Sequence, residues 1–212
     1  LIVSTESGGT ITGSGTFDWN SSAPIAANVD TGYEFTGWTG SGVDDTMSLT
    51  TTIAMTQDRN VTATFAIKSY ELATSSSAGG SVSQSGNYDH GTQATIIAVP
   101  QTGFYFTGWL GEGINDLNAS TTTVSMTQDR NISANFDAIA HDLVVSAASG
   151  GSATGSGRFN YSTNAAITAS PDEGHYFTNW SGEGLGDANS PSTTVSMTQD
   201  RNVTANFAST PI

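Results

Sequence analysis

The chain repeats itself with a period of 71 residues, and no insertion or deletion interrupts that period. Large aromatic residues recur in this register, together with many glycines and polar residues. They include Trp38, Trp109, Trp180, Phe65, Phe136 and Phe207. A strict period of this length predicts tandem copies of one small unit. We place the three copies at residues 1–67, 68–138 and 139–212.

The sequence within each copy predicts short β-strands. Apolar and polar residues alternate in short stretches between glycine-rich turns, and no helical period is present. A strand over 93–99 ends at Pro100, and an aromatic strand follows over 104–109. The glycine pair at 79–80 and its copies at 8–9 and 150–151 predict a hairpin turn. The segments 122–126 and 131–136 predict a second hairpin.

Composition excludes several classes of function. Nineteen acidic residues against five basic ones make binding to nucleic acid or to anionic lipid unfavourable. The absence of cysteine excludes disulfides, thiolate metal sites and a cysteine nucleophile. No apolar run approaches the roughly 18 residues of a membrane helix, so we expect no membrane insertion. Leu1 aligns with strand residues Leu72 and Leu143, which suggests a fragment of a longer protein.

The recurring tryptophans and phenylalanines are predicted to form the core of each unit. Each tryptophan follows two other aromatic residues in an apolar strand, and the unit has few other large side chains. The alternative is an exposed indole on which a sugar ring stacks. The predicted core residues are Trp38, Trp109, Trp180, Phe65, Phe136 and Phe207.

A second aromatic position is a candidate ligand contact. Trp19 aligns with His90 and Tyr161, so the residue type varies while a ring that can both pack and hydrogen-bond is kept. The surrounding sequence is polar. An exposed row of these three side chains would favour binding of a polysaccharide or another surface ligand, whereas the alternative is a loop aromatic that covers the end of its own domain.

Glycine-rich acidic loops are candidate Ca²⁺ sites, because closely spaced oxygen ligands on a flexible backbone suit this ion. The candidate ligands are Asp44, Asp45, Glu112, Asp116, Glu183 and Asp187. None of the loops matches an EF-hand, and the alternative is that the aspartates cap turns. Arg59 and its copies are predicted to brace a neighbouring loop through the planar guanidinium. No other cofactor is expected.

The chain resembles the divergent internalin-type B-repeat of bacterial surface and secreted proteins. The resemblance rests on three segments of each copy, which in the first are the glycine pair at 8–9, Gly-Tyr-Glu-Phe-Thr-Gly-Trp at 32–38 and Met-Thr-Gln-Asp-Arg-Asn-Val-Thr-Ala-Thr-Phe at 55–65. The third copy departs from the second segment at Asn179. The resemblance implies a mainly β, β-grasp-like unit and no catalytic residues. The residues also allow a small β-sandwich, and short linkers predict an elongated rod.

These observations together predict a non-enzymatic stalk or spacer in a large bacterial extracellular or cell-surface protein. Its expected partners are the neighbouring modules of the same chain, and we expect it to be a monomer. The alternative is an accessory adhesion module that binds polysaccharide or a host surface ligand by avidity over three copies.

Overall fold

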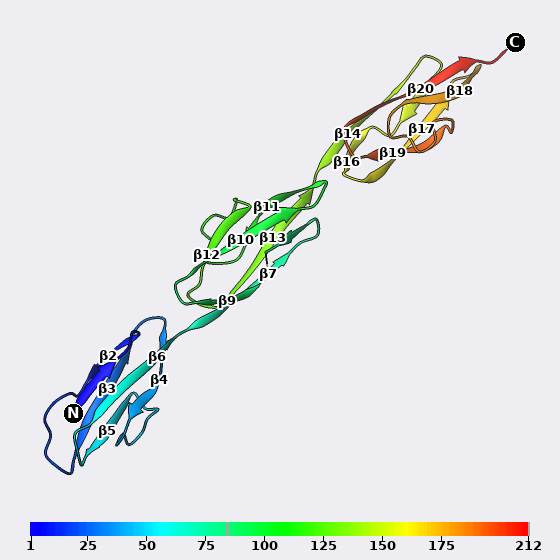
Figure 1. Cartoon of the computed structure of the whole chain (residues 1–212). Coiled ribbons are helices and arrows are strands. Elements are labelled where there is room, and N and C mark those ends of the chain that lie inside the picture. The colour runs from blue at the N-terminus through cyan, green and yellow to red at the C-terminus, as the bar shows by residue number, and fades with distance from the viewer. Residues whose placement is uncertain (84, 212) are drawn as a thin grey trace. The chain divides into compact units, whose positions relative to one another are not determined.

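Every regular element of the protein is a β-strand (Figure 1), in a computed structural model that describes residues 1–83 and 85–211. The first repeat contains β1 (Ile2–Thr5), β2 (Gly9–Thr12), β3 (Ser21–Val29), β4 (Tyr33–Gly40), β5 (Thr50–Met55) and β6 (Asn60–Ile67). The second contains β7 (Ser69–Ser76), β8 (Gly80–Val82), β9 (Gly86–Asp89), β10 (Gln93–Pro100), β11 (Phe104–Leu110), β12 (Thr121–Ser125) and β13 (Arg130–Ala138). The third contains β14 (Ala140–Ala147), β15 (Gly151–Thr154), β16 (Gly157–Asn160), β17 (Thr163–Pro171), β18 (His175–Gly182), β19 (Ser192–Met197) and β20 (Arg201–Ser209). The prediction of a mainly β chain is confirmed.

The strands of each repeat form two sheets. Their orders are β1-β6-β4 and β2-β3-β5 in the first repeat, β11-β13-β7-β9 and β12-β10-β8 in the second, and β16-β14-β20-β18 and β15-β17-β19 in the third. The described residues contain no helix, so each repeat takes the two-sheet form rather than a β-grasp with its helix. In the first and third repeats, the first strand of the repeat pairs in parallel with the last, as β1 does with β6 and β14 with β20.

The two predicted hairpins are wrong. In the third repeat, β14 pairs with β16 and β20, whereas β15, which follows the Gly150-Gly151 turn, pairs with β17 in the other sheet. Likewise β19 pairs with β17, and β20 pairs with β14 and β18. The turns therefore carry the chain from one sheet to the opposite sheet. Because both sheets of a two-sheet core turn one face inward, the alternation of apolar and polar residues is the same whichever sheet a strand joins.

Residues from both sheets fill the core between them. In the third repeat, β17 turns three small or branched side chains inward while the residues between them face outward. Trp180 of the opposite sheet is 2% exposed and packs against Phe177 at 5.8 Å between ring centroids. Its indole Nε1–H donates to the Ser190 carbonyl at 3.0 Å. The core of this repeat comprises Leu143, Ala165, Ile167, Ala169, Trp180, Val195, Met197, Val203 and Ala205.

The two glycines of the recurring pair have different structural roles. Gly150 has a φ of 102°, a conformation that L side chains rarely adopt. Gly151 instead lies under an aromatic ring, where an added Cβ atom would come 2.5 Å from Cζ of Phe207. The first glycine thus serves the turn, and the second allows close packing of the core.

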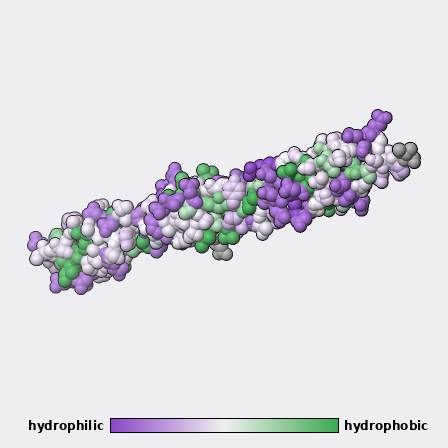
Figure 2. Space-filling model, turned by 90° about the horizontal axis from the view of Figure 1, so that it is seen from above, coloured by the Kyte–Doolittle hydropathy of each residue, from purple (hydrophilic) through white to green (hydrophobic). Residues whose placement is uncertain are grey.

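The outer surface is mostly polar. On the face shown in Figure 2, apolar surface occurs in small patches separated by hydrophilic ones. Among the large apolar side chains that are exposed, Trp19 stands out at 78%. The part of the chain that the structure describes has no helix long and apolar enough to span a bilayer.

Candidate functional site

The aspartates of the acidic loops stabilise turns in all three repeats. Each accepts, through Oδ1, a hydrogen bond from the N–H two residues further on. These bonds join Asp45 to Met47, Asp116 to Asn118 and Asp187 to Asn189, at 2.8–2.9 Å. Each aspartate N–H also donates to a threonine hydroxyl, of Thr51, Thr122 and Thr193 respectively. A carboxylate that accepts a hydrogen bond from the backbone N–H two residues later is typical of an Asx turn.

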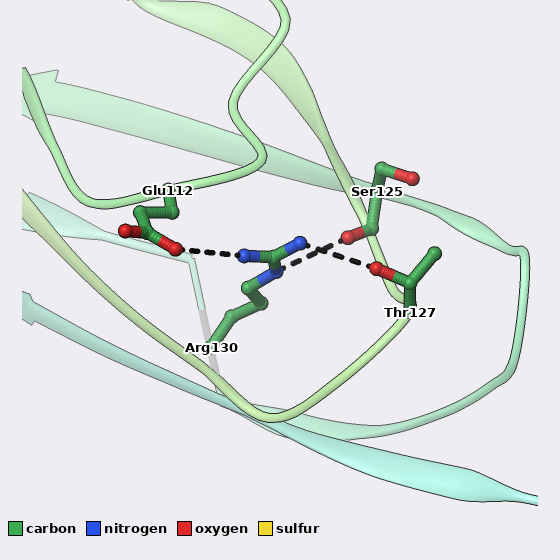
Figure 3. Close-up of polar contacts among 4 residues, drawn as sticks. All are labelled: Glu112, Ser125, Thr127 and Arg130. Carbon is green, nitrogen blue, oxygen red and sulfur yellow. Dashed lines mark hydrogen bonds and ion pairs between the residues drawn. The ribbon is translucent and has the colours of Figure 1, made fainter.

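An arginine from the following turn clamps each acidic loop. In the second repeat, Arg130 donates to the Ser125 carbonyl at 3.3 Å, to the Thr127 hydroxyl at 3.2 Å and to the Glu112 carboxylate at 3.5 Å (Figure 3). The guanidinium lies over Gly113, whose φ is 79° and where an added Cβ atom would come 2.9 Å from Cζ. The glycine therefore makes room for the arginine.

The first and third repeats keep this clamp, and the partner of the guanidinium changes in the first repeat. Arg201 donates to Glu183 at 3.0 Å, whereas Arg59 donates to the Ser41 hydroxyl at 2.7 Å because the first repeat has serine at this position. The side chain of Glu183 is 81% exposed, so its ion pair with Arg201 adds little to stability, about 0–1 kcal/mol. The clamp is thus mainly a network of hydrogen bonds.

These loops do not bring a set of metal ligands together. Within residues 1–83 and 85–211, no group of three or more carboxylate or imidazole side chains is placed to hold an ion. Glu112 and Glu183 face the arginines, and Asp44 is exposed at the loop surface beside Asp45. Calcium binding by Asp44, Asp45, Glu112, Asp116, Glu183 or Asp187 stays a prediction of the sequence.

In the second and third repeats, the second aromatic position lies where the repeat meets the one before it. Lys68, the single residue between β6 and β7, donates its N–H to the Gly32 carbonyl at 2.8 Å and accepts from the His90 N–H at 2.8 Å. The His90 ring packs directly on Gly32, where an added Cβ atom would collide with the ring. We call this set of Gly32, Lys68 and His90 the first joint.

The same contacts recur 71 residues later. Ile139 lies alone between β13 and β14, donates to the Gly103 carbonyl at 2.8 Å and accepts from the Tyr161 N–H at 2.7 Å. A Cβ atom at Gly103, whose φ is 85°, would collide with the Tyr161 ring. Gly103, Ile139 and Tyr161 form the second joint. The role of these glycines in the joints was not predicted from the sequence, although their recurrence in register was a signal.

The three aligned aromatic residues therefore do not share one environment. His90 and Tyr161 are partly buried in the joints, whereas Trp19 is 78% exposed and lines a shallow depression with Phe17, Met55, Gln57 and Asp58. These three positions therefore do not form an exposed row of rings.

The predicted core aromatics lie inside their repeats. Trp38, Trp109 and Trp180 are 2–5% exposed, and Trp38 donates its indole N–H to the Ser48 carbonyl at 2.9 Å. Phe136 is buried, and Phe65 and Phe207 are partly buried against the cores. An indole in this position has no face free for a sugar ring.

A histidine and an aspartate meet beside the second joint. Nδ1 of His141 lies 3.3 Å from Oδ1 of Asp200, the same oxygen accepts the Asp142 N–H at 2.9 Å, and the His141 ring lies near the Tyr161 ring. The hydrogen bond from Asp142 is the main cause that lowers the pKa of the Asp200 carboxyl, and His141 lowers it further.

We expect the Asp200 carboxyl to titrate below the value of about 3.9 that is usual for aspartate. Because the folded-state pKa is lowered, the contact stabilises the third repeat at neutral pH, and this contribution is lost as the pH falls through that pKa. A ¹³C NMR titration of the carboxyl measures the midpoint. The substitution His141→Ala should raise it only partway, because the Asp142 bond remains. A midpoint at or above the usual value in the unmodified chain would contradict the assignment.

The fold and the joints together define a class of protein: a tandem array of small two-sheet β units connected by single-residue linkers. The chain belongs to the divergent InlB B-repeat domain family, whose model matches residues 1–69, 70–140 and 141–211. These limits fall within two residues of Lys68 and Ile139. Domains of this family are repeats of bacterial surface and secreted proteins.

Other comparisons add little. The solved structure "The Bacillus anthracis TIE protein" is similar at 8% sequence identity, with a TM-score of 0.37. The match covers 95% of this chain and 44% of that chain, so this chain spans less than half of the length of the protein it is compared with. No curated protein matches the chain.

Proposed function

We propose that this chain is a non-catalytic spacer segment of a bacterial extracellular or cell-surface protein, which holds another module of the same protein at a distance. The observation that carries the proposal is the joint. Lys68 and Ile139 each bond to the repeat before and to the repeat after, and an aromatic ring packs on a glycine across each boundary. Such contacts restrict hinge motion, which a spacer of defined length requires.

A second candidate function is ligand binding through Trp19. The exposed indole and the shallow depression beside it favour this reading, because exposed aromatic rings are typical contacts for sugars. Binding by avidity over three copies receives less support, since His90 and Tyr161 pack in the joints. A single weak site would gain nothing from the tandem arrangement.

The spacer proposal is tested by changing the number of repeats. We expect that duplicating residues 70–140 in register lengthens the molecule by about 25–30 Å, the span of a compact 71-residue unit. Small-angle X-ray scattering on the full chain and on the chain with the duplication measures the increase in maximum dimension. The overall dimension of a flexible array grows only with the square root of repeat number, so such an array would give a smaller increase.

The matched control inserts ten Gly/Ser residues after Lys68 and after Ile139, so that the joints lose their single-residue spacing. This variant should scatter as a broader distribution of sizes. If duplication adds much less than one repeat length, or if the control and the unmodified chain scatter alike, the spacer proposal fails.

A further inference from the structure

The two joints contain a histidine and a tyrosine in exchanged places. In the first joint, His90 packs on the glycine and Tyr70 lies beside it, with the ring centroids 5.9 Å apart. In the second joint, Tyr161 packs on the glycine and His141 lies beside it, at 6.3 Å. Each place of the pair recurs after 71 residues. The side chain type that changes charge near neutral pH therefore has a different environment in each joint.

One nitrogen of the His90 ring has nothing to bond to in the closed joint. Nδ1 is buried, and none of residues 1–83 and 85–211 offers it a hydrogen-bond partner. The neutral ring fits this environment with its proton on Nε2, because Nδ1 then needs no acceptor. The protonated ring carries an N–H on both nitrogens, so a donor of a charged group would be buried without an acceptor. Protonated His90 is therefore more stable in water than against Gly32.

The charged groups on the segments around His90 are exposed to solvent. They are Asp30 and Glu34 beside the glycine turn, Lys68 in the linker, Glu71 in β7, Asp89 in β9, and Asp129, which accepts the Glu71 N–H. The other titratable residues there are Tyr33, Tyr70 and Tyr88. Within the part of the chain that the structure describes, His90 takes part in no ion pair. Water and salt screen exposed carboxylates, so they offset little of the cost of the unsatisfied N–H.

The histidine of the second joint has an acceptor. Nδ1 of His141 lies 3.3 Å from Oδ1 of Asp200, so a proton on this nitrogen forms a charge-assisted hydrogen bond. The carboxylate stays ionised in mild acid, because the Asp142 N–H, His141 and the charge of Arg158 hold the pKa of Asp200 below its usual value. The ring on the glycine is that of Tyr161, and a phenol does not change charge below pH 8. Mild acid therefore does not weaken this joint.

We propose that the first joint is a pH-dependent contact, which loosens when His90 is protonated, while the second joint stays closed. The neutral ring is the form that fits the closed joint. The joint is therefore favoured above the pH range in which histidine titrates, and its stability falls as the pH drops through that range. Acid would thus free the array at one boundary only. The inference concerns contacts inside the joints and does not depend on the spacer proposal.

Hydrogen exchange of the two linker amides in the full chain measures each joint separately. The Lys68 N–H donates to the Gly32 carbonyl, and the Ile139 N–H donates to the Gly103 carbonyl. Protection factors, which correct for the pH dependence of intrinsic exchange, report the open fraction at each pH. We expect the protection of Lys68 to fall about tenfold from about pH 8 to about pH 5, and that of Ile139 not to fall. If Lys68 keeps its protection, or if both amides lose it equally, the proposal is overturned.

The substitution His90→Tyr is the matched control. It removes the titrating group and keeps a ring that the chain already uses in the same place, at Tyr161. The protection of Lys68 in this variant should be the same at about pH 5 as at about pH 8. Acid sensitivity that survives the substitution would come from the carboxylates around the joint, such as Asp30 and Asp89, and would overturn the proposal.

The pH range of the effect identifies the group without any substitution. The ¹H NMR shifts of the His90 ring follow its protonation in the same samples. We expect the protection of Lys68 to fall over the range in which these shifts change. A fall that begins only below about pH 4.5, where aspartate and glutamate take up protons, would assign the effect to carboxylates and count against the proposal.

Discussion

Replacing Trp180 by alanine is expected to lower the free energy of unfolding of the third repeat by about 3–5 kcal/mol. The indole fills the space between the two sheets, and its removal leaves a cavity that Phe177 and the small alanines of the core cannot close. It also removes the donor to the Ser190 carbonyl. Native-state hydrogen exchange of the β20 amides in the full chain measures the effect on this repeat alone.

Two further substitutions make this test specific. Trp180→Phe keeps an aromatic ring but loses the indole N–H, so the loss of stability should be smaller. Trp19→Ala removes an indole of the same size from an exposed site, and a change within about 0.5 kcal/mol is expected. If Trp180→Ala and Trp19→Ala have equal effects, the role of Trp180 in the core is refuted.

Replacing Gly103 by alanine is expected to open the second joint. The new methyl group collides with the Tyr161 ring, and the positive φ of 85° adds about 1–2 kcal/mol of backbone strain. Overpacking of this kind adds about 1–3 kcal/mol more. Faster hydrogen exchange at the N–H groups of Ile139 and Tyr161, which donate to Gly103 and Ile139, measures the loss.

Gly174→Ala is the matched control for this substitution. It imposes nearly the same strain, at a φ of 77°, in a turn where the methyl group meets no described atom. The difference between the two variants therefore isolates the contact with Tyr161. Equal effects on stability, with unchanged exchange at Tyr161, would show that the ring does not pack on the glycine.

The period and the inward-facing residues could be read from the sequence. A repeat that keeps Trp38, Trp109 and Trp180 in register predicts three similar units, and alternation in short stretches predicts strands. The tryptophans were expected to lie inside because each follows other aromatic residues, and their exposure of 2–5% agrees with that expectation. Alternation reports which face of a strand is buried, and this information is local.

Strand pairing could not be predicted in the same way. The turns at Gly79-Gly80 and Gly150-Gly151 have the composition of hairpin turns, yet the third-repeat turn connects strands of opposite sheets. Which sheet a strand joins depends on contacts between residues far apart in the chain, such as Val145 with Val203.

The candidate site was also only partly visible in the sequence. The aligned rings of Trp19, His90 and Tyr161 stood out, but a position that varies between repeats suggested contact with an external ligand. Two of these rings contact the preceding repeat instead. The signal that would have shown this is the glycine turn of the neighbouring repeat, whose role depends on three-dimensional proximity.

The parallel pairing of β14 with β20 has a mechanical consequence. Because these neighbouring strands run in the same direction, the chain enters the repeat at one end of the pair and leaves it at the other. Tension applied to the two ends of the repeat would slide the strands along each other and load all of their hydrogen bonds at once. Antiparallel strands pulled from the same end would instead separate one bond at a time. The pairing of β1 with β6 has the same geometry, so each of these repeats is built to resist stretching.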